Sequence, residues 1–435
     1  MKVSICTFGC RSNQYDSTAI EELLKHHNLE TAGFPEHADA YIINTCTVTA
    51  KTDAESRRLV RKARSINPDA VIVLTGCYAQ VSPDEAASMN DVDYVLGNPE
   101  KERVVEFILK GLSIPEGRRN AQIHVGNYLN GVPFTLRTTE PIGRARVNLK
   151  VQDGCNRNCS FCIIPKARGI SRSVPLSMVL KEIEGIVLQG FKEIVLTGIH
   201  LGGWGHDLSP KKNIIDLFYE IERRGFPARF RVSSLDPDEV TDELISLLAR
   251  AKTICNHLHL PIQSGDDTIL ERMRRPYTAR HLEDIVSSLN KNIEDISIGA
   301  DVIAGFPGEG EREFENTFSL IKKLPLNYLH IFPYSKRKGT PAADMTGHVQ
   351  SSIIKKRAGD LKKLDTQKRR EFYGSFLGKR LSIVIESTRD ERTGLLKGKS
   401  KNYIPVTLDG GDSLLGTLQD VLVKQTGAEA VTGML

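Results

Sequence analysis

In the first 115 residues, short apolar runs alternate with longer amphipathic stretches. Apolar runs of this length predict strands, and the stretches between them, in which apolar residues recur with a helical period, predict helices. The expected strands are 3–8, 40–44, 70–75 and 93–96, and the expected helices are 15–27, 50–65 and one that opens at Ser82 and Pro83. Repeated strand–helix units of this kind predict a parallel sheet with helices on its faces.

The same alternation returns at Arg146, after a polar connection at 116–144 that we interpret as a linker. The expected strands are 146–152, 193–197, 229–233, 257–262, 297–304 and 328–333. The expected helices are 176–188, 213–224, 238–249, a pair over 267–290, and 311–323. These repeats fall short of a complete eight-stranded barrel, so the pattern predicts a partial (βα)6 barrel with its chemistry at the carboxyl ends of the strands.

A charged helix is expected at 355–376, and beyond Gly378 the pattern changes to short β runs. The expected strands there are 381–386, 403–408, 414–418 and 421–423. Such runs, separated by Gly, Asp and Asn, predict a small β-barrel of the oligonucleotide-binding type. The predicted fold class is therefore α/β with a small C-terminal β-barrel, and the predicted domains are 1–115, 141–371 and 374–435.

The composition is typical of a cytoplasmic protein. No apolar run approaches the roughly 18 residues that a membrane span needs, so no membrane partner is expected, and the first residues are typical of a strand rather than a signal peptide. A reducing compartment makes the eight cysteines cluster ligands or buried apolar residues rather than disulfides. The net charge of +5 permits an acidic partner such as RNA without requiring one.

A basic segment at 392–401 has Tyr403 beside it. Basic loops next to an aromatic side chain suit contacts with an RNA backbone and stacking on bases. The alternative is an ordinary solvated loop.

Three cysteines of the first region, Cys10, Cys46 and Cys77, each follow a predicted strand, and we call them the first trio. The carboxyl ends of strands in an open parallel sheet form a ligand-binding crevice, so these three thiols should converge on one edge. Three unrelated buried cysteines are the alternative. Cys6, within a strand, and Cys255, in a loop without a partner, are interpreted as inert.

A second trio, Cys155, Cys159 and Cys162, has the spacing C-x3-C-x2-C in the loop after the first barrel strand. Thiolates this close together suit a [4Fe–4S] cluster, and three ligands leave one of its irons open to a small molecule. A zinc knuckle or a disulfide is the alternative, but zinc usually takes a fourth Cys or His, and none lies nearby in the sequence.

The spacing of the second trio, with Phe161 before its last cysteine, is similar to the signature of the radical S-adenosylmethionine (SAM) enzymes. In those enzymes the open iron binds the amino and carboxylate groups of SAM. The whole chain resembles the radical SAM methylthiotransferase family, whose small C-terminal barrel is called TRAM. The motifs that carry this resemblance are 8–17, 44–48, 75–80, 153–169, 258–265, 301–309 and 333–341.

This resemblance implies an enzyme with two [4Fe–4S] clusters, one on each trio, and two molecules of SAM per reaction. In the family, one SAM methylates a sulfur carried on the first-trio cluster. The other is cleaved at the second-trio cluster and supplies a radical that removes hydrogen from an unactivated carbon, which has no acidic proton for acid–base chemistry. The implied partners are tRNA, through its anticodon loop, an electron donor such as a flavodoxin or ferredoxin, and a sulfur source.

Candidate SAM-binding residues lie near the ends of the predicted barrel strands. Glycine lets the backbone approach a ligand closely, and Ser and Gln offer neutral hydrogen bonds, although a structural role is the alternative for each residue. The candidates are Thr197, Gly198, Ser233, Ser234, Gln263, Asp301 and Gly305. His257 and His259 are interpreted as structural, and no catalytic side chain is singled out.

Within the family, the segments 77–80 and 329–335 look most like the branch that modifies N6-threonylcarbamoyladenosine of tRNA, at carbon 2 of adenine next to the anticodon. The alternatives are the branch acting on isopentenyladenosine of tRNA and the branch acting on an aspartate of a ribosomal protein, which the basic 336–338 disfavours. The family usually has another Arg after Gly169, where this chain has Ile170.

A threonylcarbamoyl group carries a carboxylate, which is costly to bury unpaired. Arg337 and Lys338 are candidates to supply the matching charge. A non-catalytic iron–sulfur protein that binds RNA is a distant alternative, because a structural cluster is normally held by four cysteines.

Overall fold

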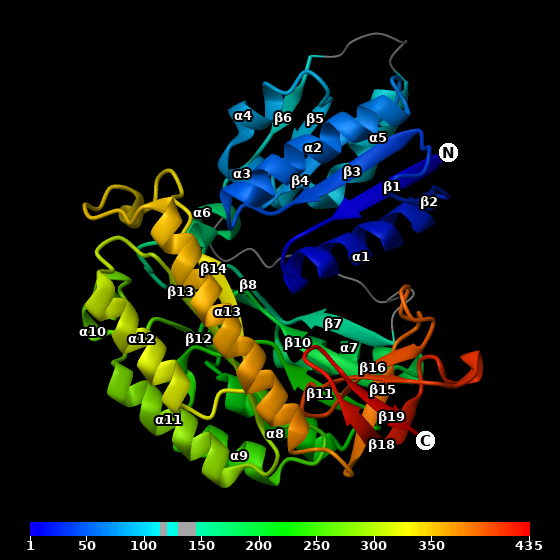
Figure 1. Cartoon of the computed structure of the whole chain (residues 1–435). Helices are drawn as coiled ribbons and strands as arrows, with labels where there is room; N and C mark the ends of the chain where they lie inside the picture. The colour runs from blue at the N-terminus through cyan, green and yellow to red at the C-terminus, as the bar shows by residue number, and fades with distance from the viewer. Residues whose placement is uncertain (114–119, 129–144) are drawn as a thin grey trace. The chain divides into compact units, whose positions relative to one another are not determined.

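The computed structural model describes residues 1–113, 120–128 and 145–435 of the chain (Figure 1). The chain divides into two compact units. One contains Met1–Ile142, Lys150–Val174 and Ser335–Ala343, and the other contains the remaining segments. The second trio therefore belongs to the same unit as the N-terminal sheet. The division into three domains at 1–115, 141–371 and 374–435 stays a prediction.

The first unit is built on a six-stranded sheet in the order β2-β1-β3-β4-β5-β6, with every pair of neighbours parallel. The strands are β1 (Lys2–Thr7), β2 (Glu30–Gly33), β3 (Ala40–Thr45), β4 (Val71–Gly76), β5 (Tyr94–Leu96) and β6 (Gln122–His124). The helices are α1 (Arg11–His26), α2 (Ala50–Ile66), α3 (Cys77–Val81), α4 (Pro83–Ala87), the 3-10 turn η1 (Pro99–Arg103) and α5 (Val104–Leu112). The predicted parallel α/β region is confirmed.

Both faces of this sheet are buried. Along β3, Ala40 and Ile42 join one apolar cluster, whereas Tyr41 and Ile43 join the cluster on the opposite face. Because successive side chains of a strand point to opposite faces, a strand covered on both sides appears as a continuous apolar run. This is why β3 and β4 were recognisable from the sequence.

The interpretation of 116–144 as a linker is wrong for 122–124, which form β6; its remaining parts at 116–119 and 129–144 lie outside the described residues. Neither edge strand, β2 or β6, was expected. Both are short and carry little buried apolar surface, and Ile123 is 42% exposed. Edge strands held mainly by backbone hydrogen bonds leave a weak apolar signal.

The central region contains two three-stranded sheets, in the orders β11-β10-β7 and β12-β13-β14. Their strands are β7 (Arg146–Lys150), β10 (Glu193–Thr197), β11 (Arg229–Val232), β12 (His257–Gln263), β13 (Ser297–Ala304) and β14 (Tyr328–Pro333). A parallel bridge between Phe230 and Ile254 links the two sheets. The prediction of a partial (βα)6 barrel is confirmed.

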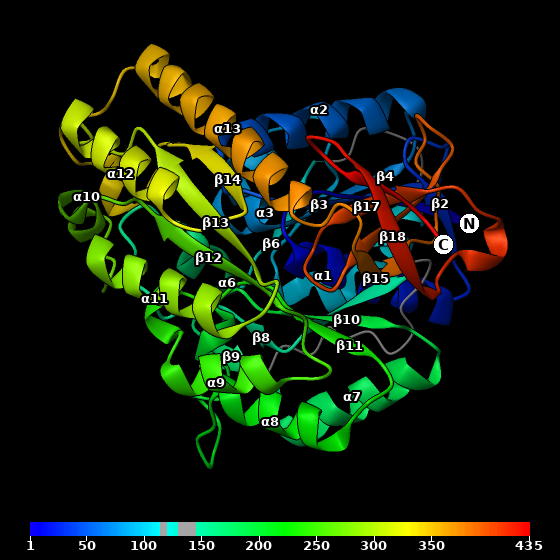
Figure 2. The ribbon, with the colours of Figure 1, turned by 60° about the horizontal axis from the view of Figure 1, so that its bottom comes forward.

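The helices of this region are α7 (Leu176–Leu188), α8 (Ile214–Arg224), α9 (Asp242–Arg250), α10 (Asp267–Arg272), α11 (Ala279–Asn292) and α12 (Glu311–Lys323). Figure 2 shows α10, α11 and α12 along the outer side of β12, β13 and β14. The 3-10 turns are η2 (Leu201–Gly203), η3 (Pro237–Glu239) and η4 (Pro341–Ala343). A hairpin of β8 (Gln152–Asp153) and β9 (Arg172–Ser173) encloses the second trio and α6 (Ile164–Arg168).

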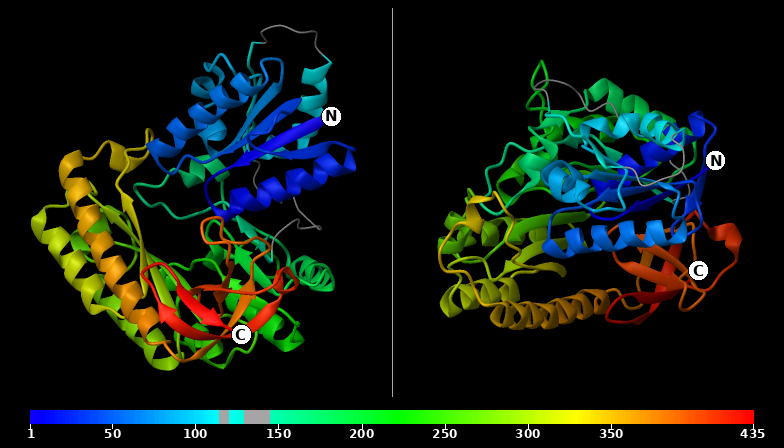
Figure 3. Two further views of the ribbon diagram at one scale, coloured as in Figure 1. Left: turned by 45° about the vertical axis from the view of Figure 1, so that its right-hand side comes forward. Right: turned by 90° about the horizontal axis from the view of Figure 1, so that it is seen from above.

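The long helix α13 (Ser351–Gly374) leads into a closed barrel with the strand order β15-β16-β17-β19-β18 (Figure 3). The strands are β15 (Arg380–Ile385), β16 (Leu396–Ser400), β17 (Pro405–Leu408), β18 (Leu418–Thr426) and β19 (Val431–Met434), with the 3-10 turn η5 (Asp412–Leu414). The predicted small β-barrel is confirmed. Among the described residues, no helix has the length and apolar character to cross a bilayer.

Two local predictions in this barrel are wrong. In place of the strand expected at 414–418, the chain has the end of η5 and a turn, and β18 begins only at Leu418. The basic segment 392–401, expected as a loop, contains β16. In β16 the buried Leu396, Gly398 and Ser400 alternate with lysines that point out of the barrel, so only one large apolar residue marks this strand.

Candidate cluster and cofactor sites

The first trio lies at the carboxyl ends of three neighbouring strands. Cys10 precedes α1 just beyond β1, Cys46 follows β3, and Cys77 follows β4. These strands are adjacent and parallel, so their ends meet at one edge of the sheet. Gly9 has φ +110°, and a Cβ there would lie 2.7 Å from the Cβ of Cys46, which brings the first two cysteine turns together. The structure thus assembles the three thiols as the sequence predicted.

The three thiols also act on one another electrostatically. Burial, together with the neighbouring thiolates of Cys77 and Cys10, raises the pKa of Cys46 to about 12. Desolvation likewise raises the pKa of Cys10, although that residue keeps some exposure to solvent, while Arg168 acts in the opposite direction. Binding to a metal centre stabilises the thiolate form of such cysteines, because the positive charge of the metal takes the place of their protons.

Buried amides and a hydroxyl hold the cysteine turns in place. The Asn13 side chain donates from Nδ2 to the carbonyls of Phe8 (3.1 Å) and Thr45 (2.8 Å). Asn44 donates to the carbonyl of Asn13 (2.9 Å), and Thr45 donates to that of Thr75 (2.5 Å). The bond to Phe8 closes the turn around Cys10, and each of the others joins the chain beside one cysteine to the chain beside another. The site is therefore fixed by side chains from the same short motifs that contain the cysteines.

The second trio lies in the loop between β8 and α6, and its cysteines are half-buried and not disulfide-bonded. The backbone N–H of Cys155 donates to the carbonyl of Gly169 (3.0 Å), and that of Cys162 donates to the carbonyl of Cys159 (3.1 Å). The carbonyl of Ser160 accepts from the N–H of Ala342 (2.8 Å). These backbone bonds shape the loop, and the backbone N–H of Arg157 donates to the sulfur of Cys155 (3.3 Å).

Neither trio has the geometry of a zinc knuckle. Tetrahedral zinc with Zn–S bonds of about 2.3 Å places its sulfur ligands about 3.8 Å apart. Among the described residues, neither trio brings its three sulfur atoms within 4.8 Å of one another. A cube of four irons is bound through separate iron atoms and takes more widely spaced thiolates. The donor sets therefore fit [4Fe–4S] clusters better than single zinc ions.

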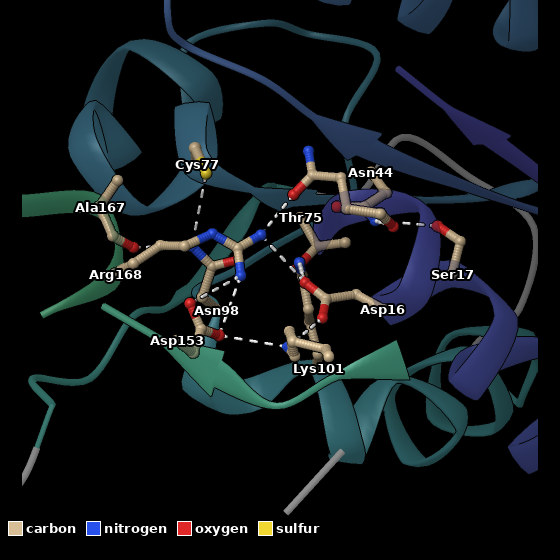
Figure 4. A network of polar contacts seen from close by, with 12 residues as sticks. Asp16, Ser17, Asn44, Thr75, Cys77, Asn98, Lys101, Asp153, Ala167 and Arg168 are labelled. Atoms are coloured by element: carbon tan, nitrogen blue, oxygen red, sulfur yellow. Dashed lines mark hydrogen bonds and ion pairs between the residues drawn. The ribbon is translucent and has the colours of Figure 1, made fainter. Parts of the chain in front are cut away.

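A buried charge network adjoins the first trio (Figure 4). Asp16 accepts hydrogen bonds from Lys101 (2.6 Å), Lys150 (2.5 Å) and Arg168 (3.0 Å). Arg168 also donates to Asp153 (3.0 Å). Burial opposes ionisation of Asp16, but the three cations outweigh it and hold its pKa well below the usual range. We call these five residues the charge network.

The sequence did not identify the charge network as a unit. Asp16 and Arg168 both fall within quoted motifs, but they are far apart in the chain, and Lys101 and Lys150 fall in no motif. Paired charges distant in sequence leave no periodic signal. Only folding brings them together.

Four of the predicted SAM contacts lie at the ends of β10 and β11, which are paired and parallel. Thr197 is the last residue of β10, and Ser233 follows β11. The hydroxyls of Thr197 and Ser233 are buried and have no hydrogen-bond partner among the described residues. Gly198 and Ser234, directly after them, are half-buried. Buried hydroxyls without a partner are costly unless a ligand satisfies them, which suits a polar cofactor.

The other three predicted SAM contacts, Gln263, Asp301 and Gly305, lie in or just after β12 and β13. Gln263 ends β12 with φ +64°. Asp301 lies inside β13 and accepts a hydrogen bond from His259 (2.7 Å), and although burial opposes it, His259 and His330 hold its pKa below the usual range. Gly305 has φ +81°, and a Cβ there would lie 2.3 Å from Cγ1 of Ile354 in α13. Asp301 and Gly305 therefore have structural explanations of their own, and their role toward SAM stays a prediction.

His257 and His259 both contact Tyr328. The Tyr328 hydroxyl lies 2.8 Å from Nε2 of His257 and 3.0 Å from Nδ1 of His259. The ring of Tyr403 lies 4.4 Å from that of His257, between centroids. These contacts support the structural interpretation of the two histidines.

The basic segment beside Tyr403 is not a free RNA-binding loop. The ammonium of Lys399 lies 4.1 Å from the centre of the Tyr403 ring, and Lys401 donates to the carbonyl of Lys252 (3.1 Å). Arg231, itself paired with the buried Glu193, donates to the carbonyls of Ser400 and Lys401. This side of the small barrel is thus bonded to β10 and β11. The expectation that Tyr403 stacks on bases is wrong for this arrangement.

Arg337, a candidate for binding the substrate carboxylate, already has partners. Its Nη2 donates to Thr47 (2.5 Å) and Asp53 (2.7 Å), and its side chain is 11% exposed. Lys336 and Lys338 on either side are exposed. The charge of Arg337 is therefore neutralised by Asp53, and of the two residues named, only Lys338 presents an exposed ammonium.

Two family models match this chain. Residues 2–97 match "Uncharacterized protein family UPF0004", and residues 149–321 match the "Radical SAM superfamily". The threonylcarbamoyladenosine tRNA methylthiotransferases MtaB of Bacillus subtilis and Aquifex aeolicus are each 39% identical to it. Those alignments cover 98% and 97% of this chain and 94% and 100% of the relatives. The tRNA-2-methylthio-N(6)-dimethylallyladenosine synthase of Fusobacterium nucleatum is 31% identical, over 98% of this chain and 97% of that protein.

Solved structures share the fold at low sequence identity. The radical S-adenosylmethionine methyltransferase TsrM from Kitasatospora setae, solved with cobalamin and a [4Fe–4S] cluster, matches with a TM-score of 0.55 and 16% identity. The match covers 79% of this chain and 76% of TsrM. At this identity the likeness concerns architecture alone.

Proposed function

This chain belongs to the radical SAM methylthiotransferase family, and we propose that it transfers a methylthio group to carbon 2 of N6-threonylcarbamoyladenosine next to the anticodon of tRNA. The observation that carries the reaction class is the presence of two separate sets of three cysteines, none of them disulfide-bonded, in one unit. The substrate follows from the relatives: four of those named for threonylcarbamoyladenosine are 35–39% identical, against 31% for the dimethylallyladenosine enzyme of Fusobacterium nucleatum.

Membership of the radical SAM superfamily implies SAM and [4Fe–4S] clusters as cofactors. We assign one cluster to each cysteine trio. When bound, the cluster with three protein ligands and an open iron supplies the electron that cleaves SAM, and the resulting radical chemistry opens a C–H bond that no side chain could deprotonate. The protein's own contribution is to hold six thiolates, exclude solvent and position SAM and the base.

We assign SAM binding to the ends of β10 and β11. The unpartnered hydroxyls of Thr197 and Ser233 are suited to hydrogen-bond the polar groups of SAM, and Gly198 lets the backbone approach it. Gln263 at the end of β12 is a further candidate. Asp301 acts indirectly in this scheme, because His259 and His330 occupy its carboxylate.

The further partners complete the proposed reaction. The protein acts in the cytoplasm on tRNA, with an electron donor such as a flavodoxin or ferredoxin and a separate sulfur source. The base must leave its stack to be modified, at a cost of about a few kcal/mol that a single-stranded anticodon loop lowers. Because Arg337 is paired with Asp53, the exposed Lys338 is the candidate to bind the carboxylate of the threonylcarbamoyl group.

The test is a substrate comparison. Reconstituted protein is incubated with SAM, a reductant and a sulfide source, and with tRNA pools that carry either threonylcarbamoyladenosine or isopentenyladenosine. Nucleoside mass spectrometry should detect methylthiolation of the first pool only. A matched Cys255→Ala variant, which alters a buried cysteine outside both trios, should retain this activity. Methylthiolation confined to the second pool, or activity on a ribosomal protein instead, would overturn the proposed substrate.

A further inference from the structure

The charge network carries more positive than negative charge. Lys101, Lys150 and Arg168 contribute three cations, whereas Asp16 and Asp153 contribute two carboxylates, and none of these side chains is more than 6% exposed. Buried charges are screened by salt much less than surface charges. Counted over these five described side chains, the network has one more positive than negative charge, and the buried Arg172, which also acts on Asp153, adds a further cation beside it.

The first trio adjoins the charge network. Arg168 donates from Nη2 to Oδ1 of Asn13 (2.5 Å), and the Nδ2 of Asn13 donates to the carbonyls of Phe8 and Thr45, next to the turns that carry Cys10 and Cys46. The Nε of Arg168 is buried and has no hydrogen-bond acceptor among the described residues. Asn98 links the segment that carries Arg168 to the first trio. Its Nδ2 donates to the carbonyl of Ala167 (2.7 Å) and lies 3.9 Å from the sulfur of Cys77 (Figure 4). A buried guanidinium with a free N–H thus adjoins the cysteine site.

We propose that the charge network sets the reduction potential of the cluster on the first trio, with Arg168 as the positioning residue that brings the excess charge to it. This inference rests on the proposed function, because it requires a cluster at that site. A cluster bound by three thiolates gains negative charge on reduction. Net charge and hydrogen bonds to sulfur are the means by which a protein adjusts the potential of such a centre. The excess positive charge of the network favours the reduced state and raises the potential.

A purely mechanical role is the competing explanation. Arg168 also ties the segment that carries the second trio to α1, through Asn13 (2.5 Å) and Asp16. If the network only braces these segments, loss of either a cation or an anion should loosen the site in the same way. An electrostatic role predicts opposite effects from removing opposite charges. The two explanations are therefore separable by the sign of the shift.

The experiment isolates the first-trio cluster in the full-length chain, in a background where the second trio is replaced by Ala. Arg168→Gln, Asp16→Asn and the double variant are reconstituted with iron and sulfide. Iron is counted, and the midpoint potential is measured by EPR-monitored titration with dithionite. Arg58→Gln, which removes an exposed surface cation from the same unit, is the matched control.

The expected result is a more negative potential in Arg168→Gln, a less negative one in Asp16→Asn, and a return towards the parent value in the double variant, which restores the net charge. Arg58→Gln should leave the potential unchanged. Shifts of the same sign in both single variants, or no shift in either, would overturn the inference. If Arg168→Gln holds no iron, the sign of the shift in Asp16→Asn decides. A parent background that binds no iron would instead refute the assignment of a cluster to the first trio.

Discussion

The two cysteine trios present their thiols by different means. The second trio is contained in one loop, and its thiols are placed by backbone hydrogen bonds within and around that loop. The first trio comes from the ends of β1, β3 and β4, and depends on the sheet and on buried side chains to converge. A local site can be recognised from spacing alone, whereas a dispersed one becomes a site only when the strand order is known. The dispersed site should therefore also be the more sensitive to loss of tertiary structure.

The largest expected effect comes from removing each trio in turn. Replacing Cys155, Cys159 and Cys162 with Ala should halve the iron content and abolish reductive cleavage of SAM, because the open iron that binds SAM is lost. Replacing the first trio should also halve the iron but leave SAM cleavage measurable while methylthiolation stops. Iron and sulfide assays and the formation of 5′-deoxyadenosine provide the measurements. Full iron content after loss of the first trio would show that this trio holds no iron–sulfur cluster.

The next effect tests the dependence of the first trio on tertiary contacts. In Asn44→Ala the buried carbonyl of Asn13 and the hydroxyl of Ser17 lose a donor, at a cost of about 1–3 kcal/mol in the free energy of unfolding. Iron at the first trio should then be released at a lower denaturant concentration, while SAM cleavage persists. Asn292→Ala, which removes the hydrogen bonds of an exposed side chain to Ser288 in α11, is the control. Equal loss of iron from both sites would contradict the expectation that the first trio depends more strongly on tertiary contacts than the second.

A smaller effect is expected at the proposed SAM contacts. Thr197→Val and Ser233→Ala should each weaken SAM binding about fivefold, equivalent to about 1 kcal/mol for one hydrogen bond. Thermal stability should not fall, because neither hydroxyl has a partner to lose among the described residues. Equilibrium dialysis of SAM against reconstituted protein measures this, with the exposed Ser65→Ala as control. Unchanged affinity would mean that these hydroxyls only fill space.

The smallest effect concerns the basic segment of the C-terminal barrel. Neutralising Lys397, Lys399 and Lys401 together should reduce the salt dependence of tRNA binding by the equivalent of about one phosphate contact, a change in slope of about 0.7 to 0.9. Two of the three lysines are held within the protein, so a larger change is not expected. Binding measured across a salt series tests this. A change three times as large would restore the interpretation of this segment as an RNA contact.

The basic segment also shows where inference from sequence reaches its limit. Like the second trio, it is contiguous in the chain, yet its predicted structure was wrong. A cysteine cluster carries its chemistry in the spacing of its own side chains. A lysine or tyrosine contacts RNA only if tertiary structure leaves it accessible, and here β16 and Tyr403 pack against other parts of the protein. The same holds for Arg337, which Asp53 neutralises.

The sequence by itself determined the fold class and most of the buried strands, including β10, β13 and β14 with their exact bounds. It also indicated the reaction family and singled out the six cysteines as candidate cluster ligands, because apolar periodicity and ligand spacing are local properties of the chain. Only the tertiary structure revealed the charge network, the partners of Asp301 and Arg337, and the edge strands β2 and β6. Those features depend on pairs of groups far apart in sequence, whose free energy of interaction exists only once folding has buried them side by side.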